Sequence, residues 1–413
     1  MARALPLMAG VLAAAGLAGC SPFGSNSAFT CQDNTQCNDG TGGKCEANSL
    51  CSYTDPSCMP SGQRYGDNSG GNSGRCVGDE QRDDGGMGDG PVNQVCYGAT
   101  NGLVKPCFPT APTGPVMLSG TIDTGTSSLC STTVTQANGF CVIAAETIQI
   151  EATVRAVGTK PLVLVATKTI DVGSTLEAAS RRSGAAPYVN TQTGAGSDPT
   201  GGCDGGTNPA VNGGGAGGSF IGAGGIGGAG TGGTGGAPGT KRTAVNTLRG
   251  GCRGQDAPGT GGKGGRGGGA VYLIAETSIL IDAAINASGE GGHPGITGSV
   301  GAGGGGSGGM IVLDSPMITN NSAVFANGAG GGEGSGNTTP GNPGPEPIDQ
   351  NAAPGGGGGT TNGGDGGRGS GGGMADGGNG VNDTNSGGAG GGGIGLIRVF
   401  RGTLTGAVSP APS

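Results

Sequence analysis

The most suggestive catalytic pattern in this chain is a serine set among glycines. Residues 305–309 read G-G-S-G-G and satisfy the G-x-S-x-G motif, in which a hydrolase serine sits on a sharp turn after a strand and needs a histidine base. Here Ser307 follows a run of glycines, and the only histidine of the chain, His293, precedes a proline. We therefore assign no catalytic residue from the sequence.

Three other patterns that could hold a ligand or do chemistry are incomplete. Gly262-Lys263 matches the Gly-Lys pair of a phosphate-binding loop, but no hydroxyl residue follows the lysine to bind magnesium, so the motif is incomplete. Residues 377–383 approximate a calcium-binding nonapeptide but have no tandem copy. Asp282 and Glu290 would suit a glycosidase only at a fixed separation. We predict no cofactor and no metal, and calcium remains the alternative.

The residues at the start of the chain favour lipid attachment. Arg3 precedes an apolar run, residues 5–17, which is too short to span a bilayer and suits a secretory signal. Leu17-Ala18-Gly19-Cys20 then resembles the bacterial lipobox. The resemblance implies that residues 1–19 are a removed signal peptide and that Cys20 carries a diacylglyceryl thioether and an amide-linked acyl chain, which together anchor a protein firmly. A plain cleaved signal is the alternative.

Charge and hydropathy restrict the location and the partners. Ser21 stands where aspartate is associated with inner-membrane retention in enterobacteria, so we expect placement at the outer membrane or cell surface. After the signal, no apolar stretch is long enough for a transmembrane helix, which leaves the lipid as the predicted membrane contact. The net charge is -8 and the basic residues are dispersed, which argues against nucleic acid as a partner.

The cysteine count fits an exported protein. Without Cys20, twelve of the thirteen cysteines remain, an even number that suggests disulfides. They fall into groups of six, four and two, which we expect to close locally: Cys31, Cys37, Cys45, Cys51, Cys58 and Cys76, then Cys96, Cys107, Cys130 and Cys141, then Cys203 and Cys252. No C-x-x-C motif or nearby histidine favours a metal site.

The first cysteine group carries a second resemblance. Residues 51–58, C-S-Y-T-D-P-S-C, are followed by S-G-Q-R-Y-G at 61–66 and R-C-V at 75–77. These motifs resemble a cysteine-rich leader of predicted surface lipoproteins of the myxobacterial type, a leader that implies no activity. Residues 31–78 read as a small disulfide-rich module. A tether at residues 20–30 precedes it, and an acidic, glycine-rich linker at 79–95 follows.

A spaced repeat predicts the fold of the remaining chain, residues 96–413. In four segments an isoleucine is followed six residues later by an aliphatic residue and eight later by alanine, within alternating β-branched sequence. We expect the repeat core to consist of Ile148, Val154, Ile170, Leu176, Ile279, Ile285, Ile318 and Val324. A fifth, degraded copy begins at Leu396. Copies of this length bury their apolar faces by stacking, which predicts an all-β, parallel β-solenoid-like domain, with an antiparallel β-sandwich as the alternative.

Glycine is concentrated between the copies. Of 104 glycines, 74 lie in residues 201–400, mostly in insertions at about 180–268, 289–309 and 328–393. Such insertions are expected to be loops outside the coils, disordered unless backbone pairing orders them, and tolerant of serine in place of glycine. The approximate G-G-x period of residues 224–229 fits a second arrangement, in which left-handed extended helices pack backbone to backbone.

These features favour a lipid-anchored, non-enzymatic surface protein with a structural or adhesive role. Its expected partners are the membrane and a polysaccharide or other surface proteins. The alternative is a polysaccharide lyase or hydrolase on the solenoid, which requires clustered acids or bases on one coil face and aromatic rings that stack on sugars. Seven Phe, five Tyr and no Trp meet the second requirement poorly. Ice or mineral binding would require a threonine ladder, which the repeats do not show.

Overall fold

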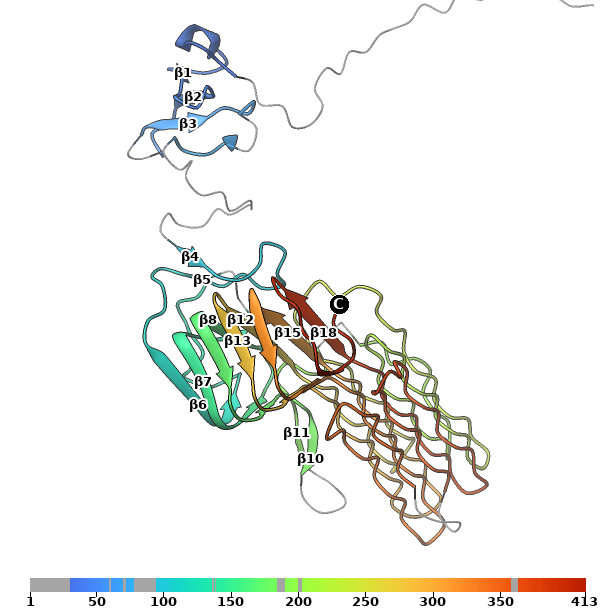
Figure 1. Cartoon of the computed structure of the whole chain (residues 1–413). Helices are drawn as coiled ribbons and strands as arrows, with labels where there is room; N and C mark the ends of the chain where they lie inside the picture. Colours follow the sequence, from blue (N-terminus) through green and yellow to red (C-terminus); the bar gives the residue numbers. More distant parts are fainter. Residues whose placement is uncertain are drawn as a thin grey trace, which may run out of the picture. The chain divides into compact units, whose positions relative to one another are not determined.

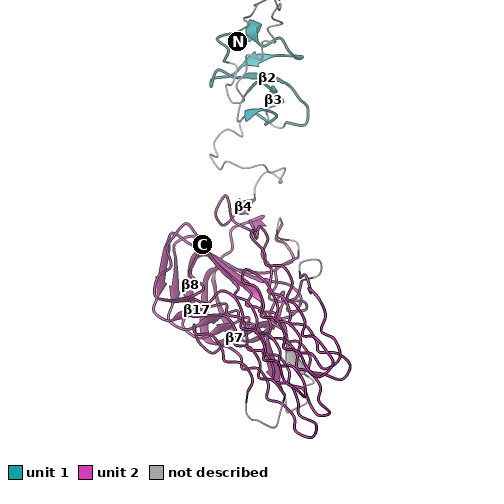
Figure 2. Cartoon of the chain, turned by 90° about the vertical axis from the view of Figure 1, so that its right-hand side faces the viewer, with its two compact units in different colours: residues 1–87 teal, residues 88–413 magenta. Residues whose placement is uncertain are grey.

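The chain folds into two compact units, residues 1–87 and 88–413 (Figure 2). The structure is a computed structural model that describes residues 30–58, 61–69, 72–77, 94–135, 137, 139–183, 190–199, 203–357 and 363–413. The predicted signal peptide, Cys20, almost all of the tether and nearly all of the acidic linker lie outside the described residues. Among the described residues, no helix is long and apolar enough to cross a bilayer.

The first unit is a small module held together by disulfides. A 3₁₀ turn, η1 (Asn34–Gln36), precedes a three-stranded antiparallel sheet of β1 (Lys44–Cys45), β2 (Cys51–Thr54) and β3 (Gln63–Tyr65). Its three disulfides are Cys31–Cys45, Cys37–Cys51 and Cys58–Cys76. Cysteines themselves form the buried cluster of this unit, with Tyr53 packed against them, so the bridges take the place of an aliphatic core.

The second unit contains a parallel β-solenoid (Figure 1). Every strand pair of its twelve-stranded sheet is parallel, which confirms the solenoid-like prediction and excludes the antiparallel sandwich. The strands of the early coils are β6 (Pro115–Asp123), β7 (Cys141–Val157), β8 (Leu162–Val172) and β9 (Leu176–Glu177). The later coils consist of β12 (Ala270–Ala275), β13 (Ser278–Ile281), β14 (Ile285–Asn286), β15 (Met310–Asp314), β16 (Met317–Asn320), β17 (Ala323–Phe325), β18 (Leu396–Phe400) and β19 (Ala407–Ser409).

The repeat aligned in the sequence is the register of this sheet. Ile148, Ile170, Ile279 and Ile318 are direct partners on successive coils, and Val154, Leu176, Ile285 and Val324 form a second such row. All are buried except Ile318, which is only partly buried although it packs against the same core. Its strand, β16, pairs with β13 alone, so no further strand covers it. β6 adds a partial first coil that the sequence comparison missed.

The strands that begin successive coils, such as β8, β12 and β15, form a row that is buried on both faces. Its inward side chains join the solenoid core, while outward side chains such as Tyr272 and Val312 enter a second apolar cluster. Tyr97, Val104 and Phe108 cover that face from one segment, and Phe220, Val245 and Leu248 cover it from the first glycine-rich insertion. Strands buried on both faces read as continuous apolar runs, as in A-V-Y-L-I-A at residues 270–275.

Two small hairpins and three further disulfides complete the second unit. One hairpin joins β4 (Val95–Cys96) to β5 (Cys107–Phe108), and the other joins β10 (Arg181–Ser183) to β11 (Asn190–Gln192). The bridges are Cys96–Cys107, Cys130–Cys141 and Cys203–Cys252. The six disulfides within the described residues therefore all close inside the three cysteine groups.

The glycine-rich insertions form an ordered bundle of extended segments (Figure 1). All three leave the solenoid at the same point of the coil, after the row of β9, β14 and β17, so successive insertions emerge next to one another. Backbone hydrogen bonds then join segments that are far apart in sequence, for example Gly228 N–H to Gly388 O at 2.7 Å.

The segment at residues 300–309 shows how these helices pack. From Gly303 to Gly309, successive N–H groups donate to three neighbouring segments in turn, at 2.8–3.0 Å. Gly303, Gly306 and Gly309 donate to residues 287–293, Gly304 and Ser307 donate to residues 252–255, and Gly305 and Gly308 donate to residues 390–393. A cycle of three residues per turn without internal hydrogen bonds identifies a helix of the polyproline II type.

The bundle corrects two expectations about glycine. The described parts of the insertions are not disordered loops, because neighbouring backbones satisfy one another's hydrogen bonds. Nor do buried glycines have room for serine: a Cβ at Gly304 would overlap the carbonyl oxygen of Ala216, and one at Gly306 would overlap that of Arg266. The central segments 301–309 and 386–395 are buried throughout, whereas segment 261–269 carries Lys263 and Arg266, three residues apart, toward solvent.

Candidate functional site

The serine and histidine of the hydrolase-like pattern have structural partners. Ser307 is fully buried in the bundle, where its Oγ accepts the Cys252 N–H at 2.8 Å and donates to Gly308 O at 3.2 Å. His293 is also buried, and its Nε2 lies 3.0 Å from Glu290 Oε1. The other Glu290 oxygen accepts the Arg266 N–H. The geometry therefore gives Ser307 a packing role.

The calcium-like segment is also engaged within the bundle. Asp376, Asn379 and Asn382 present one side-chain oxygen every third residue. These oxygens accept the N–H groups of Ala223, Ile226 and Ala229, respectively, at 2.7–2.9 Å. These three hydrogen bonds join two extended helices along their length. Asp282 accepts a hydrogen bond from Asn321, so it and Glu290 serve different local contacts.

The solenoid does carry acidic and basic side chains on one coil face. The carboxylate of Asp314, on β15, is buried and accepts the Tyr272 hydroxyl at 2.8 Å and the Ala99 N–H at 2.7 Å. Arg401 pairs with Asp314 and, at 3.0 Å, with Glu276. Burial, followed by the Asp314 charge, raises the pKa of Tyr272. The cluster lies beneath the Ala99 segment and attaches that segment to the sheet.

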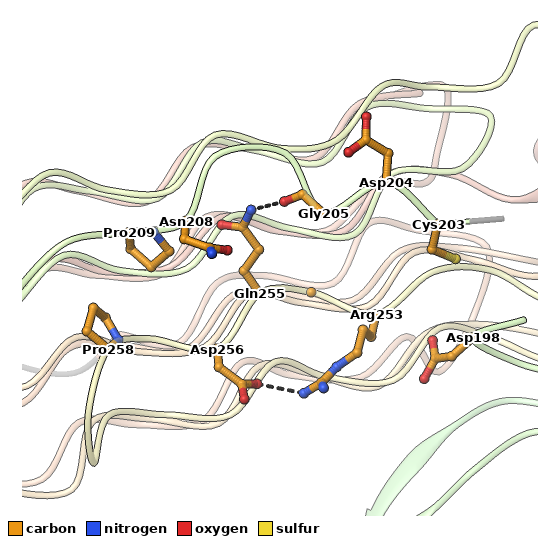
Figure 3. Close-up of a pocket in the computed structure, with 11 residues that line it drawn as sticks. Asp198, Cys203, Asp204, Gly205, Asn208, Pro209, Arg253, Gln255, Asp256 and Pro258 are labelled. Atoms are coloured by element: carbon orange, nitrogen blue, oxygen red, sulfur yellow. Dashed lines mark hydrogen bonds and ion pairs between the residues drawn. The ribbon is translucent and has the colours of Figure 1, made fainter. Parts of the chain in front are cut away.

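A polar groove beside the last disulfide is the strongest candidate for a ligand site (Figure 3). It has a volume of about 580 Å³, within the usual range of ligand pockets. The groove lies on the bundle, between the chain that follows Cys203 and the helix that follows Cys252. Its lining includes Asp198, Asp204, Asn208, Pro209, Arg253, Gln255, Asp256 and Pro258.

The disulfide and one glutamine hold the two sides of the groove together. Cys203–Cys252 links segments separated by 49 residues. Gln255 Nε2 donates to Thr207 O at 3.2 Å and to Ala237 O at 3.0 Å, while its Oε1 accepts the Ala216 N–H at 3.1 Å. The groove is thus defined by a covalent link and by hydrogen bonds to three other segments.

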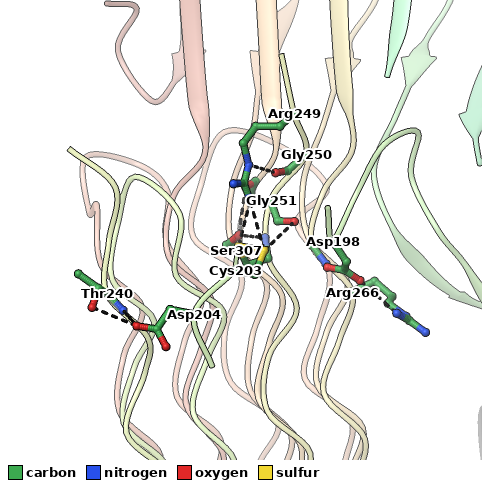
Figure 4. The surroundings of a disulfide bond; sticks show 12 residues. Asp198, Cys203, Asp204, Thr240, Arg249, Gly250, Gly251, Arg266 and Ser307 are labelled. Carbon is green, nitrogen blue, oxygen red and sulfur yellow. Dashed lines mark hydrogen bonds and ion pairs between the residues drawn. A yellow bond between two sulfur atoms is a disulfide. The ribbon is translucent and has the colours of Figure 1, made fainter. Parts of the chain in front are cut away.

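The interior behind the groove contains a buried cation (Figure 4). Arg249 Nη2 lies 3.2 Å from Cys203 Sγ and 3.4 Å from Cys252 Sγ. Its guanidinium also lies 5.2 Å from the centre of the Phe220 ring, a cation–π contact. Burial, reinforced by Arg242, lowers the pKa of Arg249 to about 10. The arginine packs against the disulfide and fixes its surroundings.

The three carboxyl groups of the groove have different electrostatic environments. Burial raises the pKa of Asp198, although the Gly267 N–H and Arg266 oppose this shift. For Asp256, burial also raises the pKa, but the Gly264 N–H together with Arg253 and Lys263 outweighs it, and the pKa lies below its usual value. Hydrogen bonds from the Gly206 N–H and from Thr240 lower the pKa of Asp204. The groove therefore combines one carboxyl of raised pKa with two of lowered pKa.

The groove retains hydrogen-bonding capacity for a ligand. In the described part of the chain, the Asn208 amide makes no hydrogen bond, and Arg253 uses only Nη2, which bonds Asp256 at 2.6 Å. The carboxylates of the groove, Asp198, Asp204 and Asp256, do not lie close enough together to share one metal ion. Among the described residues, the only three metal-type ligands close together are Cys31, Cys37 and Cys45, and all of them are in disulfides.

A second groove, of about 600 Å³, differs in chemistry. It is mostly apolar and is lined by Pro294, Ile296, Pro340 and Pro343, and its polar lining residues are Thr260, Lys263, His293 and Asn342. We take the polar groove as the candidate because its unused donors and acceptors can select a ligand by hydrogen bonding.

Apart from Cys203, no residue that lines the polar groove belongs to a motif recognised in the sequence. The available signal was the isolated pair Cys203 and Cys252 inside glycine-rich sequence, each followed by polar residues. Their closeness depends on the bundle. The chain matches no family model, no curated protein and no solved structure.

Proposed function

We propose that this chain is a lipid-anchored cell-surface protein with a structural or adhesive role, which binds its ligand without chemical turnover. The observation that carries the proposal is the ordered glycine bundle. Its central helices consist almost entirely of glycine, alanine and serine, and each helix face bonds to a neighbouring backbone. Such construction supports a rigid surface scaffold, since the bundle interior has few side chains that could do chemistry.

The disulfide pattern supports the proposed location. Twelve cysteines are paired within the described residues, and the thirteenth is Cys20, at the lipobox-like position. Disulfides of this number are typical of oxidising compartments. An exported chain with one remaining cysteine, placed directly after the apolar run, fits attachment to the outer membrane or cell surface through lipid.

Cys20→Ser is expected to move the protein from the membrane fraction to the soluble fraction, because the thioether cannot form and no other anchor is proposed. Fractionation followed by immunoblotting measures the change. Ser21→Ala is the matched control and should remain with the membranes. If the Cys20→Ser protein still requires detergent for extraction, the lipid anchor is wrong.

One observation favours the alternative, a polysaccharide lyase or hydrolase. Asp198 has a raised pKa and Asp204 a lowered pKa within the same groove. Carboxyl groups with pKa values shifted in opposite directions are the usual arrangement for a general acid and its partner. Both carboxyl groups are already held by backbone N–H groups, Asp198 by Gly267 and Asp204 by Gly206.

Incubation of the purified full-length chain with plant, fungal and bacterial polysaccharides separates the two functions. We expect retention on one or more polysaccharides and no new reducing ends or unsaturated products. Asp198→Asn and Asp204→Asn proteins serve as controls for contaminating enzymes. Turnover by the unmodified chain that either substitution abolishes would replace the proposed function with the enzymatic one.

A further inference from the structure

We infer that the polar groove beside Cys203–Cys252 is a binding site for an uncharged oligosaccharide. This inference rests on the proposed function, because it names the ligand class of the same surface protein. Its basis is the pairing of charges in the groove together with the side-chain groups that remain unused.

The charges that surround the groove are balanced in number. Asp256 accepts from Arg253 and pairs with Lys263 at 3.2 Å, and Asp198 pairs with Arg266 at 3.2 Å. Asp204 has only hydrogen-bond donors as partners in the described part of the chain. Three carboxylates, Asp198, Asp204 and Asp256, therefore stand against three cations, Arg253, Lys263 and Arg266, and the groove has no net charge that would attract an anionic ligand. Carboxylates that point to separate partners do not form a cation site either.

The unused groups suit hydroxyl-bearing ligands. The Asn208 amide offers both donors and an acceptor, and Arg253 retains Nε and Nη1 as donors. Asp204 has lone pairs beyond those bonded to Gly206 and Thr240. A sugar hydroxyl both donates and accepts hydrogen bonds, so adjacent hydroxyls can bond a mixed set of donors and acceptors at once.

The groove also has apolar surface and sufficient space. The rings of Pro209 and Pro258 line it and present C–H groups against which a sugar ring can pack (Figure 3). Its volume, about 580 Å³, exceeds the lower end of the range for small-ligand pockets, roughly 300 Å³. None of the described residues that line the groove is aromatic, so the binding energy must come mainly from hydrogen bonds, and we expect weak affinity for short oligosaccharides.

The test measures binding of neutral oligosaccharides to the full-length chain in a detergent without a sugar headgroup. The probes are cello-, xylo-, malto- and N-acetylchito-oligosaccharides, followed by saturation-transfer NMR and by titration. Asn208→Ala should weaken binding about three- to tenfold, the effect of one or two lost hydrogen bonds. Arg253→Ala should weaken it at least as much. Arg368→Ala is the matched control, since this exposed arginine lies on the bundle outside the groove and should leave affinity unchanged.

Each outcome decides a separate point. Loss of affinity in both groove variants, with the Arg368→Ala protein unchanged, supports the site. Equal affinity in all the proteins would place binding elsewhere and overturn the groove assignment. Absence of binding by every neutral oligosaccharide at millimolar concentration would overturn the ligand class. Cleavage of a bound oligosaccharide would instead overturn the non-enzymatic function, while the groove and its ligand class would stand.

Discussion

Ile279→Ala is expected to lower the free energy of unfolding by about 2–5 kcal/mol, the usual result of truncating a buried isoleucine side chain to alanine. Ile279 is fully buried in the solenoid core and lies between its register partners Ile170 and Ile318. Removal of its side chain leaves a cavity in the middle of an apolar row, where rigid neighbouring strands limit collapse. Denaturant unfolding followed by circular dichroism measures the loss.

Ile296→Ala is the matched control, because this isoleucine is 49% exposed. Its effect should remain within about 0.5 kcal/mol. Similar losses for the Ile279→Ala and Ile296→Ala proteins would contradict the solenoid register, since the register gives the two isoleucines very different surroundings.

Gly304→Ala is expected to destabilise the bundle by about 1–3 kcal/mol, the range for overpacking a tightly filled interior. The added Cβ would overlap the Ala216 carbonyl oxygen, and the chain would have to move away from it. That movement would weaken the neighbouring hydrogen bonds, such as Gly304 N–H to Gln255 O and Gly265 N–H to Gly304 O, at 2.9 and 2.8 Å. Amide hydrogen exchange should show faster opening of residues 300–309.

Gly205→Ala provides the matched control for this substitution. A Cβ at Gly205 meets no atom within 4 Å, and its backbone is not in the left-handed region that favours glycine. We expect the Gly205→Ala protein to unfold as the unmodified protein does. If the Gly304→Ala protein also unfolds unchanged, with unchanged amide exchange, the helices of the bundle do not pack backbone to backbone.

The two stability predictions test different kinds of core. The solenoid buries branched aliphatic side chains, so its stability depends on apolar area removed from water. The bundle buries mainly backbone, and its stability depends on hydrogen bonds between helices that only glycine allows to approach closely. The two cores are therefore sensitive to different substitutions: removal of side-chain atoms weakens the solenoid, and addition of side-chain atoms weakens the bundle.

The solenoid could be predicted because its signal is local and periodic. Ile148, Ile170, Ile279 and Ile318 recur with the same spacing to their following aliphatic residues, and identical positions in stacked coils must become direct partners. β6 was missed because a register shift breaks the spacing: Val116 pairs with Ile148, but Gly120, only four residues later, pairs with Val154. The groove was not predictable in the same way, since Asn208 and Arg253 carry no motif and meet only through the fold.

By itself, the sequence determined the all-β class, the register of the coils and the local grouping of the cysteines, because each depends on residue spacing within or between short segments. Whether the glycine-rich insertions are ordered or disordered was decided only by the tertiary structure. A polyproline II helix has no internal hydrogen bonds, so a glycine run contains no local information about whether it is ordered. Segment 303–309 is ordered because backbone segments from distant parts of the chain accept hydrogen bonds from its N–H groups on three sides.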